Sequence, residues 1–195
     1  MKFLSKYLWV FLLLFSFSSK AQLTDEQILK IDSLKEVIST AKHDTIKINA
    51  LVAWDDIIYI SDPELDLELN QQIVDICETN LKNELNELEL KKFKKSLGTS
   101  YNNIGIICWH QGNYEKALEY YLKSLKICEE IGDKKGMGAS YNNIGITYKD
   151  QGNNEKALEY FLNGKNIYQE INVITGLDKT SEYLSKVYKK LGKYK

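Results

Sequence analysis

Apolar residues recur along much of this chain at spacings of three and four, the period of a helix with one buried face. The first such segment also carries Thr24 with Gln27 three residues later, a pair typical of a capped helix start. Only one Pro interrupts the whole sequence, which favours long helices. The pattern therefore predicts an all-α protein. The segments with the clearest period are 23–40, 114–131 and 181–195.

Two stretches of the chain are nearly the same. Fifteen of the twenty residues at 101–120 recur forty positions later, at 141–160. Self-similarity at such a period is the mark of stacked repeats, in which each unit buries its apolar face against its neighbours. Each copy contains a Gln-Gly-Asn turn, where Gly closes one helix and Asn caps the next. We therefore expect two helix-turn-helix units, at 101–140 and 141–180.

Small residues stand opposite each other in the two helices of each copy. They are Gly105 and Ala117 in the first copy, and Gly145 and Ala157 in the second. Side chains this small let two helices approach closely. We expect tight hairpins in both units.

A degenerate copy precedes these two units. Shifting the sequence by 51 positions aligns this copy with the unit at 101–140. The alignment predicts one helix at 46–60 and a second from Pro63 to about residue 90. The eleven extra residues fall in a Leu-, Glu- and Lys-rich segment at 81–95. We interpret residues 45–100 as a degenerate unit whose second helix is extended. The alternative is that the segment is a docking surface for a partner.

Single helices are expected at both ends of the stack. Residues 22–44 are interpreted as an amino-terminal capping helix, because a terminal unit needs one face that tolerates water. Residues 181–195 match the first helix of a further unit. That helix either caps the array or begins a unit of a longer one.

The amino-terminal residues have the order of a secretory signal. Lys2 and Lys6 give a positive start, and an apolar run follows at 7–17. Small residues then precede a cleavage position before Gln22, and the apolar run is short for a membrane span. We expect residues 1–21 to be a signal peptide and the protein to be exported, periplasmic or secreted, with no membrane contact after cleavage. A retained anchor is the alternative.

Composition narrows the class of partner. Every basic residue is Lys, so the planar guanidinium that grips phosphates and guanine edges is missing from the chain. The isoelectric point is about 6.2. Both observations argue against nucleic acid as a partner.

The sequence offers little for catalysis. It has two His, His43 and His110, without a suitably spaced partner carboxylate, and no phosphate-binding loop or metal-ligand spacing. Its three cysteines are an odd number and read as buried core residues: Cys77, Cys108 and Cys128. We expect no catalytic residue, no metal and no cofactor.

The placement of aromatic, small and glycine residues resembles tetratricopeptide repeats, whose pattern runs through an aromatic, Leu-Gly, Tyr, Ala, aromatic and small residue. In the first copy these places hold Tyr101, Ile104, Gly105, Cys108, Ala117, Tyr121 and Ser124. In the second copy they hold Tyr141, Ile144, Gly145, Tyr148, Ala157, Phe161 and Gly164. The forty-residue period is similar to that of a longer-repeat subgroup found in Pins-type and kinesin-light-chain scaffolds and in bacterial regulators.

This resemblance implies a right-handed superhelical α-solenoid whose concave wall, built from the first helix of each unit, holds an extended peptide. It also implies that Asn103 and Asn143 face this groove and bond the peptide backbone. The alternative is that both bond only neighbouring helices. Helical spacing adds further groove candidates: Asn102, Ile106, Trp109, His110, Asn142, Ile146, Lys149 and Asp150.

Together these features predict an exported, non-catalytic scaffold or adaptor that binds a peptide or protein partner in its concave groove. The alternative is the extracytoplasmic sensor region of a bacterial signalling protein, either a histidine kinase or a DNA-binding regulator.

Overall fold

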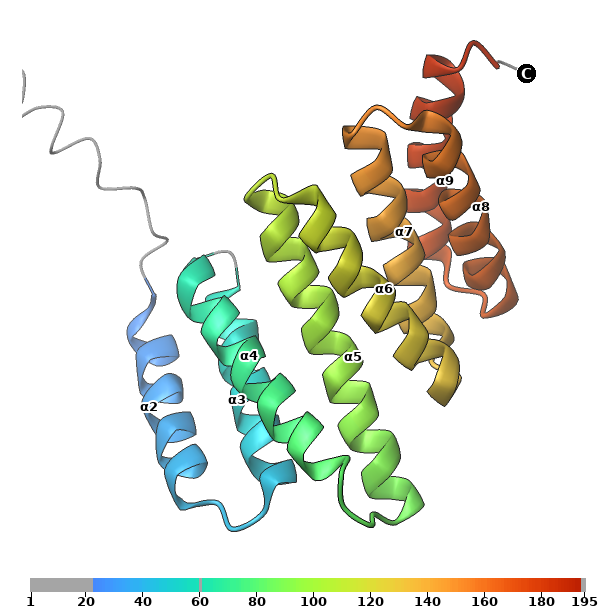
Figure 1. The fold of residues 1–195 in the computed structure, drawn as a ribbon. Coiled ribbons are helices and arrows are strands. Elements are labelled where there is room, and N and C mark those ends of the chain that lie inside the picture. Colours follow the sequence, from blue (N-terminus) through green and yellow to red (C-terminus); the bar gives the residue numbers. More distant parts are fainter. Residues whose placement is uncertain (1–22, 60, 194–195) are drawn as a thin grey trace, which may run out of the picture.

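The computed structural model describes residues 23–59 and 61–193, and these form an α-solenoid. Their helices are α2 (Asp25–Thr40), α3 (Asp44–Ile58), α4 (Pro63–Asn80), α5 (Glu87–His110), α6 (Tyr114–Ile131), α7 (Lys134–Asp150), α8 (Asn154–Glu170) and α9 (Ile174–Lys190). No strand occurs in this part of the chain. Successive helices run in opposite directions and stack as hairpins, with α2 at one end and α9 at the other (Figure 1).

The turns of the two copies have the same local geometry. Gly112 and Gly152 have φ values of +73° and +83°, the left-handed region that favours glycine. In each case the following Asn, Asn113 or Asn153, accepts a hydrogen bond from a backbone N–H three residues on, at 3.2 and 3.1 Å. The shared Gln-Gly-Asn sequence therefore ends one helix and caps the next in both hairpins.

Glycines in the first helix of each hairpin receive an aromatic ring from the second. A Cβ atom built on Gly105 would lie 2.6 Å from Cε1 of Tyr121, and one built on Gly145 would lie 2.7 Å from Cδ1 of Phe161. Both rings are almost completely buried. The two nearly identical copies thus occupy the same kind of environment, and only glycine leaves space for the ring.

The prediction that the second helix of unit 45–100 is extended is wrong. Helix α4 ends at Asn80, and the extra residues lengthen α5 instead, so that α5 starts at Glu87. The cause is a capping box at Asn86, whose side chain accepts from the N–H of Glu89 at 2.9 Å while the Glu89 carboxylate accepts from the N–H of Asn86. This local signal starts a new helix inside a segment whose composition favours helix throughout.

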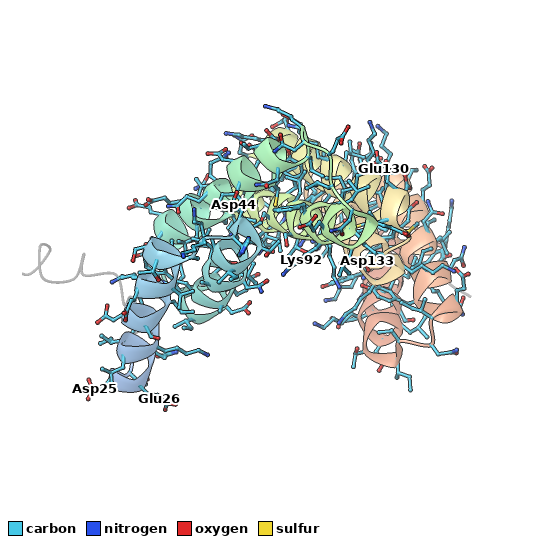
Figure 2. The ribbon with its side chains drawn as sticks, turned by 90° about the horizontal axis from the view of Figure 1, so that it is seen from below. Asp25, Glu26, Asp44, Lys92, Glu130 and Asp133 are labelled. Atoms are coloured by element: carbon cyan, nitrogen blue, oxygen red, sulfur yellow. The ribbon has the colours of Figure 1, made fainter. Side chains whose placement is uncertain are left out.

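The stack curves into an arch (Figure 2). Helix α3 contacts α5, α5 contacts α7, and α7 contacts α9, whereas α4, α6 and α8 do not contact one another. Helices on the inside of a curve lie closest together, so α3, α5, α7 and α9 form the wall of the hollow side. Lys92 of α5 points into this hollow in Figure 2. We call these four helices the inner wall.

The predicted signal peptide, residues 1–21, lies outside the described residues. Among the helices that the structure describes, none combines the length and apolar character required to cross a membrane.

Candidate functional site

Asparagine amides link neighbouring helices of the inner wall. The Asn143 side chain on α7 donates to Oδ1 of Asn102 on α5 at 2.9 Å. One step further along, the buried Asn142 donates to the Thr180 hydroxyl of α9 at 2.8 Å. Each pair spans two inner helices, so these asparagines hold the wall together through side-chain hydrogen bonds.

Asn103 makes the equivalent contact towards the amino-terminal end. Its amide donates to Oδ2 of Asp55 at 3.1 Å and to Oδ1 of Asn70 at 3.3 Å. The second Asn of each Asn-Asn pair thus reaches back to an earlier helix, as Asn143 does. Bonds of Asn103 and Asn143 to neighbouring helices, which the sequence left as an alternative, are present in the structure.

A second set of predicted residues meets near the carboxyl ends of α5 and α7. The indole N–H of Trp109 donates to Oδ2 of Asp150 at 3.0 Å, and Lys149 forms an ion pair with Oδ1 of the same carboxylate at 3.0 Å. The imidazole of His110 packs edge-on against the Trp109 ring, with centroids 4.8 Å apart. Residues that differ between the two copies therefore bind one another across the wall.

The two predicted isoleucines lie in different settings. Ile106 is half-buried and lines a cavity beside α3 and α4. Ile146 is also half-buried and packs against the core cluster that contains Ala157, Phe161 and Leu184. All ten predicted residues are on α5 and α7 of the inner wall, but most of their polar atoms are engaged within the fold. Their contact with a partner remains a prediction.

A cleft that sequence reasoning missed lies between the middle of α5 and the amino-terminal half of α7. Its volume is about 360 Å³, and Ser124 and Cys128 of α6 contribute to it. The inner helices supply Lys95, Thr99, Asn102, Lys135 and Ala139 to the same cleft. Lys95 and Lys135 are forty positions apart, so the repeat itself was the signal that could have found them. Neither forms an ion pair with a described residue.

A buried carboxyl pair was also missed. Asp55 of α3 and Asp66 of α4 are only 4% and 3% exposed, and the Asn70 amide donates to both, at 2.8 and 2.7 Å. Burial, together with the Asp66 carboxyl beside it, raises the pKa of Asp55 to about 8. Sliding the sequence by 51 places Asp66 on Ala117 and Asn70 on Tyr121. Polar residues at core positions of the repeat were the available signal.

Neither reactive thiols nor metal-ligand clusters are found among the described residues. Burial raises the pKa of Cys77 to about 12 and that of Cys128 to about 11, so neither thiol supplies a thiolate near neutral pH. No group of three or more His, Cys, Asp or Glu side chains in the described part of the chain is arranged to hold a metal ion. What the inner wall offers is a set of amide, hydroxyl and ammonium groups suited to binding.

Comparisons with solved structures agree with this architecture. The crystal structure of aspartyl phosphate phosphatase F from Bacillus subtilis is similar, with a TM-score of 0.72 and 18% identity over 86% of this chain. This chain spans 45% of that protein's length. The crystal structure of BtubC (BKLC) from P. vanneervenii gives a TM-score of 0.53 and 17% identity, covering 87% of this chain and 86% of that one. No curated protein matches the sequence.

Stacked hairpins with an inner wall of alternate helices define the chain as a helical-repeat protein of the α-solenoid class. A family model for tetratricopeptide repeats matches residues 96–170. This segment is therefore a tetratricopeptide repeat region, as the sequence predicted, and such repeats generally mediate protein–protein interaction. Membership of the forty-residue subgroup stays a prediction.

Proposed function

We propose that this protein is an exported, non-catalytic scaffold whose inner wall binds an extended segment of a partner protein. The observation that carries the proposal is the cleft between α5 and α7, whose lining residues other than Lys95 fall within the tetratricopeptide repeat region. Repeats of this family generally mediate protein–protein interaction. A concave wall of parallel helices offers a partner segment a long surface.

The side chains available to a partner differ from the asparagines that the sequence predicts to bind it. Asn103 and Asn143 already donate to side chains of the fold, so losing either would disturb the wall as well as any bound segment. Lys95, Thr99 and Lys135 are better placed, because they line the cleft and their side chains form no such bonds to another described helix. Ammonium and hydroxyl groups can donate to the carbonyl oxygens of an extended backbone.

Reversing the charge of the cleft tests this proposal. We expect Lys95→Glu combined with Lys135→Glu to reduce capture of the partner at least tenfold, because both donors are lost and two negative charges face the cleft. The measurement is quantitative mass spectrometry of polypeptides retained by the immobilised protein from an extract of the source cells. Circular dichroism checks that the variant remains helical.

Matched exposed lysines provide the control. Lys116 and Lys126 lie on α6 and do not line the cleft, so Lys116→Glu with Lys126→Glu makes the same change of charge elsewhere. We expect this control to retain the same polypeptides as the wild type. Equal retention by the cleft variant, or an equal loss in the control, would contradict the assignment of the cleft.

Export is tested separately on the full chain. We expect the protein recovered from the periplasm or medium of a Gram-negative host to begin at Gln22, because the amino-terminal residues have the order of a cleavable signal. The measurement is the intact mass. The double substitution Leu12→Arg and Leu13→Arg would break the apolar run and should leave the uncleaved chain in the cytoplasm. If the wild-type protein had the mass of the uncleaved chain in every cell fraction, cleavage would be rejected.

A further inference from the structure

A cavity of about 290 Å³ lies where α3, α4 and α5 meet, separate from the cleft between α5 and α7. Most of its lining is apolar, and one carboxyl group reaches it. Both Ile106 and His110, which helical spacing predicted to face a partner, contribute to its wall. Its lining includes Tyr59, Pro63, Asp66, Ile106, Ile107 and His110.

The carboxyl group in this cavity lacks a counter-charge. Asp66 is 97% buried, since only 3% of it is exposed, yet it forms no ion pair with any described residue. Its hydrogen-bond partners are the neutral amide of Asn70 and the carboxyl of Asp55. Buried carboxylates in proteins are normally paired with a cation, because removing an ion from water is costly. The missing partner points to a cationic ligand.

The protonation of the Asp55–Asp66 pair also favours a cationic ligand. Asp55 keeps its proton to about pH 8 because its pKa is raised by burial and by Asp66, and that proton is shared with the Asp66 carboxylate. Near neutral pH Asp55 is therefore the protonated member of the pair. The Asn103 amide bonds Asp55 on the α5 side, so the Asp66 carboxyl is the member that reaches the cavity.

We propose that this cavity binds the ammonium group of a lysine side chain presented by the partner segment, with Asp66 as its counter-ion. The inference rests on the proposed function and adds the chemistry of one partner residue. Pro63, Ile106 and Ile107 suit the aliphatic stem of lysine, which buries its methylenes while its charged head seeks a polar group. The compact ammonium matches a single carboxylate better than a planar guanidinium, which prefers bidentate partners.

The test uses a lysine side-chain analogue and does not need the partner. n-Butylammonium is titrated into the protein while the methyl resonances of Ile106 and Ile107 are followed by NMR. We expect saturable shifts with a millimolar dissociation constant, the range open to a ligand of so few atoms. Neutral n-butanol should bind at least tenfold more weakly, and sodium chloride at equal ionic strength should leave these resonances unchanged.

Two isosteric variants complete the test. Asp66→Asn should weaken n-butylammonium binding at least tenfold while n-butanol binding is retained, because it removes only the charge. Asp56→Asn, the same change at an exposed aspartate of the neighbouring helix α3, should bind like the wild type. Amide spectra verify that both variants are folded. Equal binding of the alcohol and the ammonium, or unaltered binding by Asp66→Asn, would overturn the inference.

The outcomes separate this inference from the proposed function. Partner capture that depends on Lys95 and Lys135, without n-butylammonium binding, would reject only the lysine cavity. The reverse result would leave the cavity intact and reject the cleft as the partner site. Tighter binding of n-propylguanidinium than of n-butylammonium would overturn the choice of lysine over arginine.

Discussion

Replacing Phe161 with alanine is expected to lower the free energy of unfolding by about 3–5 kcal/mol, the cost of removing a buried aromatic side chain. The ring is completely buried, lies against Gly145 and stacks on Tyr183 of α9 with centroids 5.2 Å apart. Its loss leaves a void between three helices that cannot close without moving them. Urea unfolding followed by circular dichroism measures the change.

Leu162 is the matched control for this prediction. It is the next residue on α8 but is 38% exposed, so its truncation to alanine removes far less buried surface. We expect a loss below about 1.5 kcal/mol for Leu162→Ala, less than full burial of a leucine contributes. A loss for Phe161→Ala no larger than this would show that the ring is not a core contact.

Stability is also expected to fall as the pH rises from 6 to 8. The Asp55 pKa is about 8 in the folded protein, whereas an aspartate in an unfolded chain titrates near 4. The folded state therefore holds one more proton than the unfolded state between these values, and its stability declines through that window. The largest slope for one proton is about 1.4 kcal/mol per pH unit. Urea titrations at pH 6, 7 and 8 measure it.

Asp55→Asn should remove most of this slope, because the amide carries no titrating proton. The neutral side chain should also make the variant more stable than the wild type at pH 8, where the wild type begins to place a negative charge on the buried Asp55. A wild-type stability that rises between pH 6 and 8, or a slope that persists in Asp55→Asn, would contradict the raised pKa.

Much of the fold could be predicted from the sequence because its determinants are local. The Gln-Gly-Asn turns, the Thr24 cap and the small residues that receive rings all act within one hairpin. The extra helical turns were assigned to the wrong helix because composition at 81–95 favours helix without saying where one begins. Asn86 with Glu89 carried that information, and this short signal outweighed the longer pattern.

The candidate site was harder to predict because its partners lie on different helices. The spacing of Asn102 and Asn143 indicates one face of each helix, but not that their amides lie 2.9 Å apart. The same holds for Trp109 and Asp150, which are 41 positions apart in the chain. A buried Asp66 is unexpected on composition alone, and only the packing of α3, α4 and α5 shows that it reaches a cavity.

The hydrogen bonds between the inner helices have a mechanical consequence. Asn102 with Asn143, and Asn142 with Thr180, tie adjacent helices on the hollow side only, because the outer helices do not contact one another. These hydrogen bonds hold the inner helices in place, and so fix the curvature of the arch, without a bound partner. Because the wall is already ordered, little of the binding free energy of a partner segment would go into ordering it, which favours tight association from a modest number of contacts.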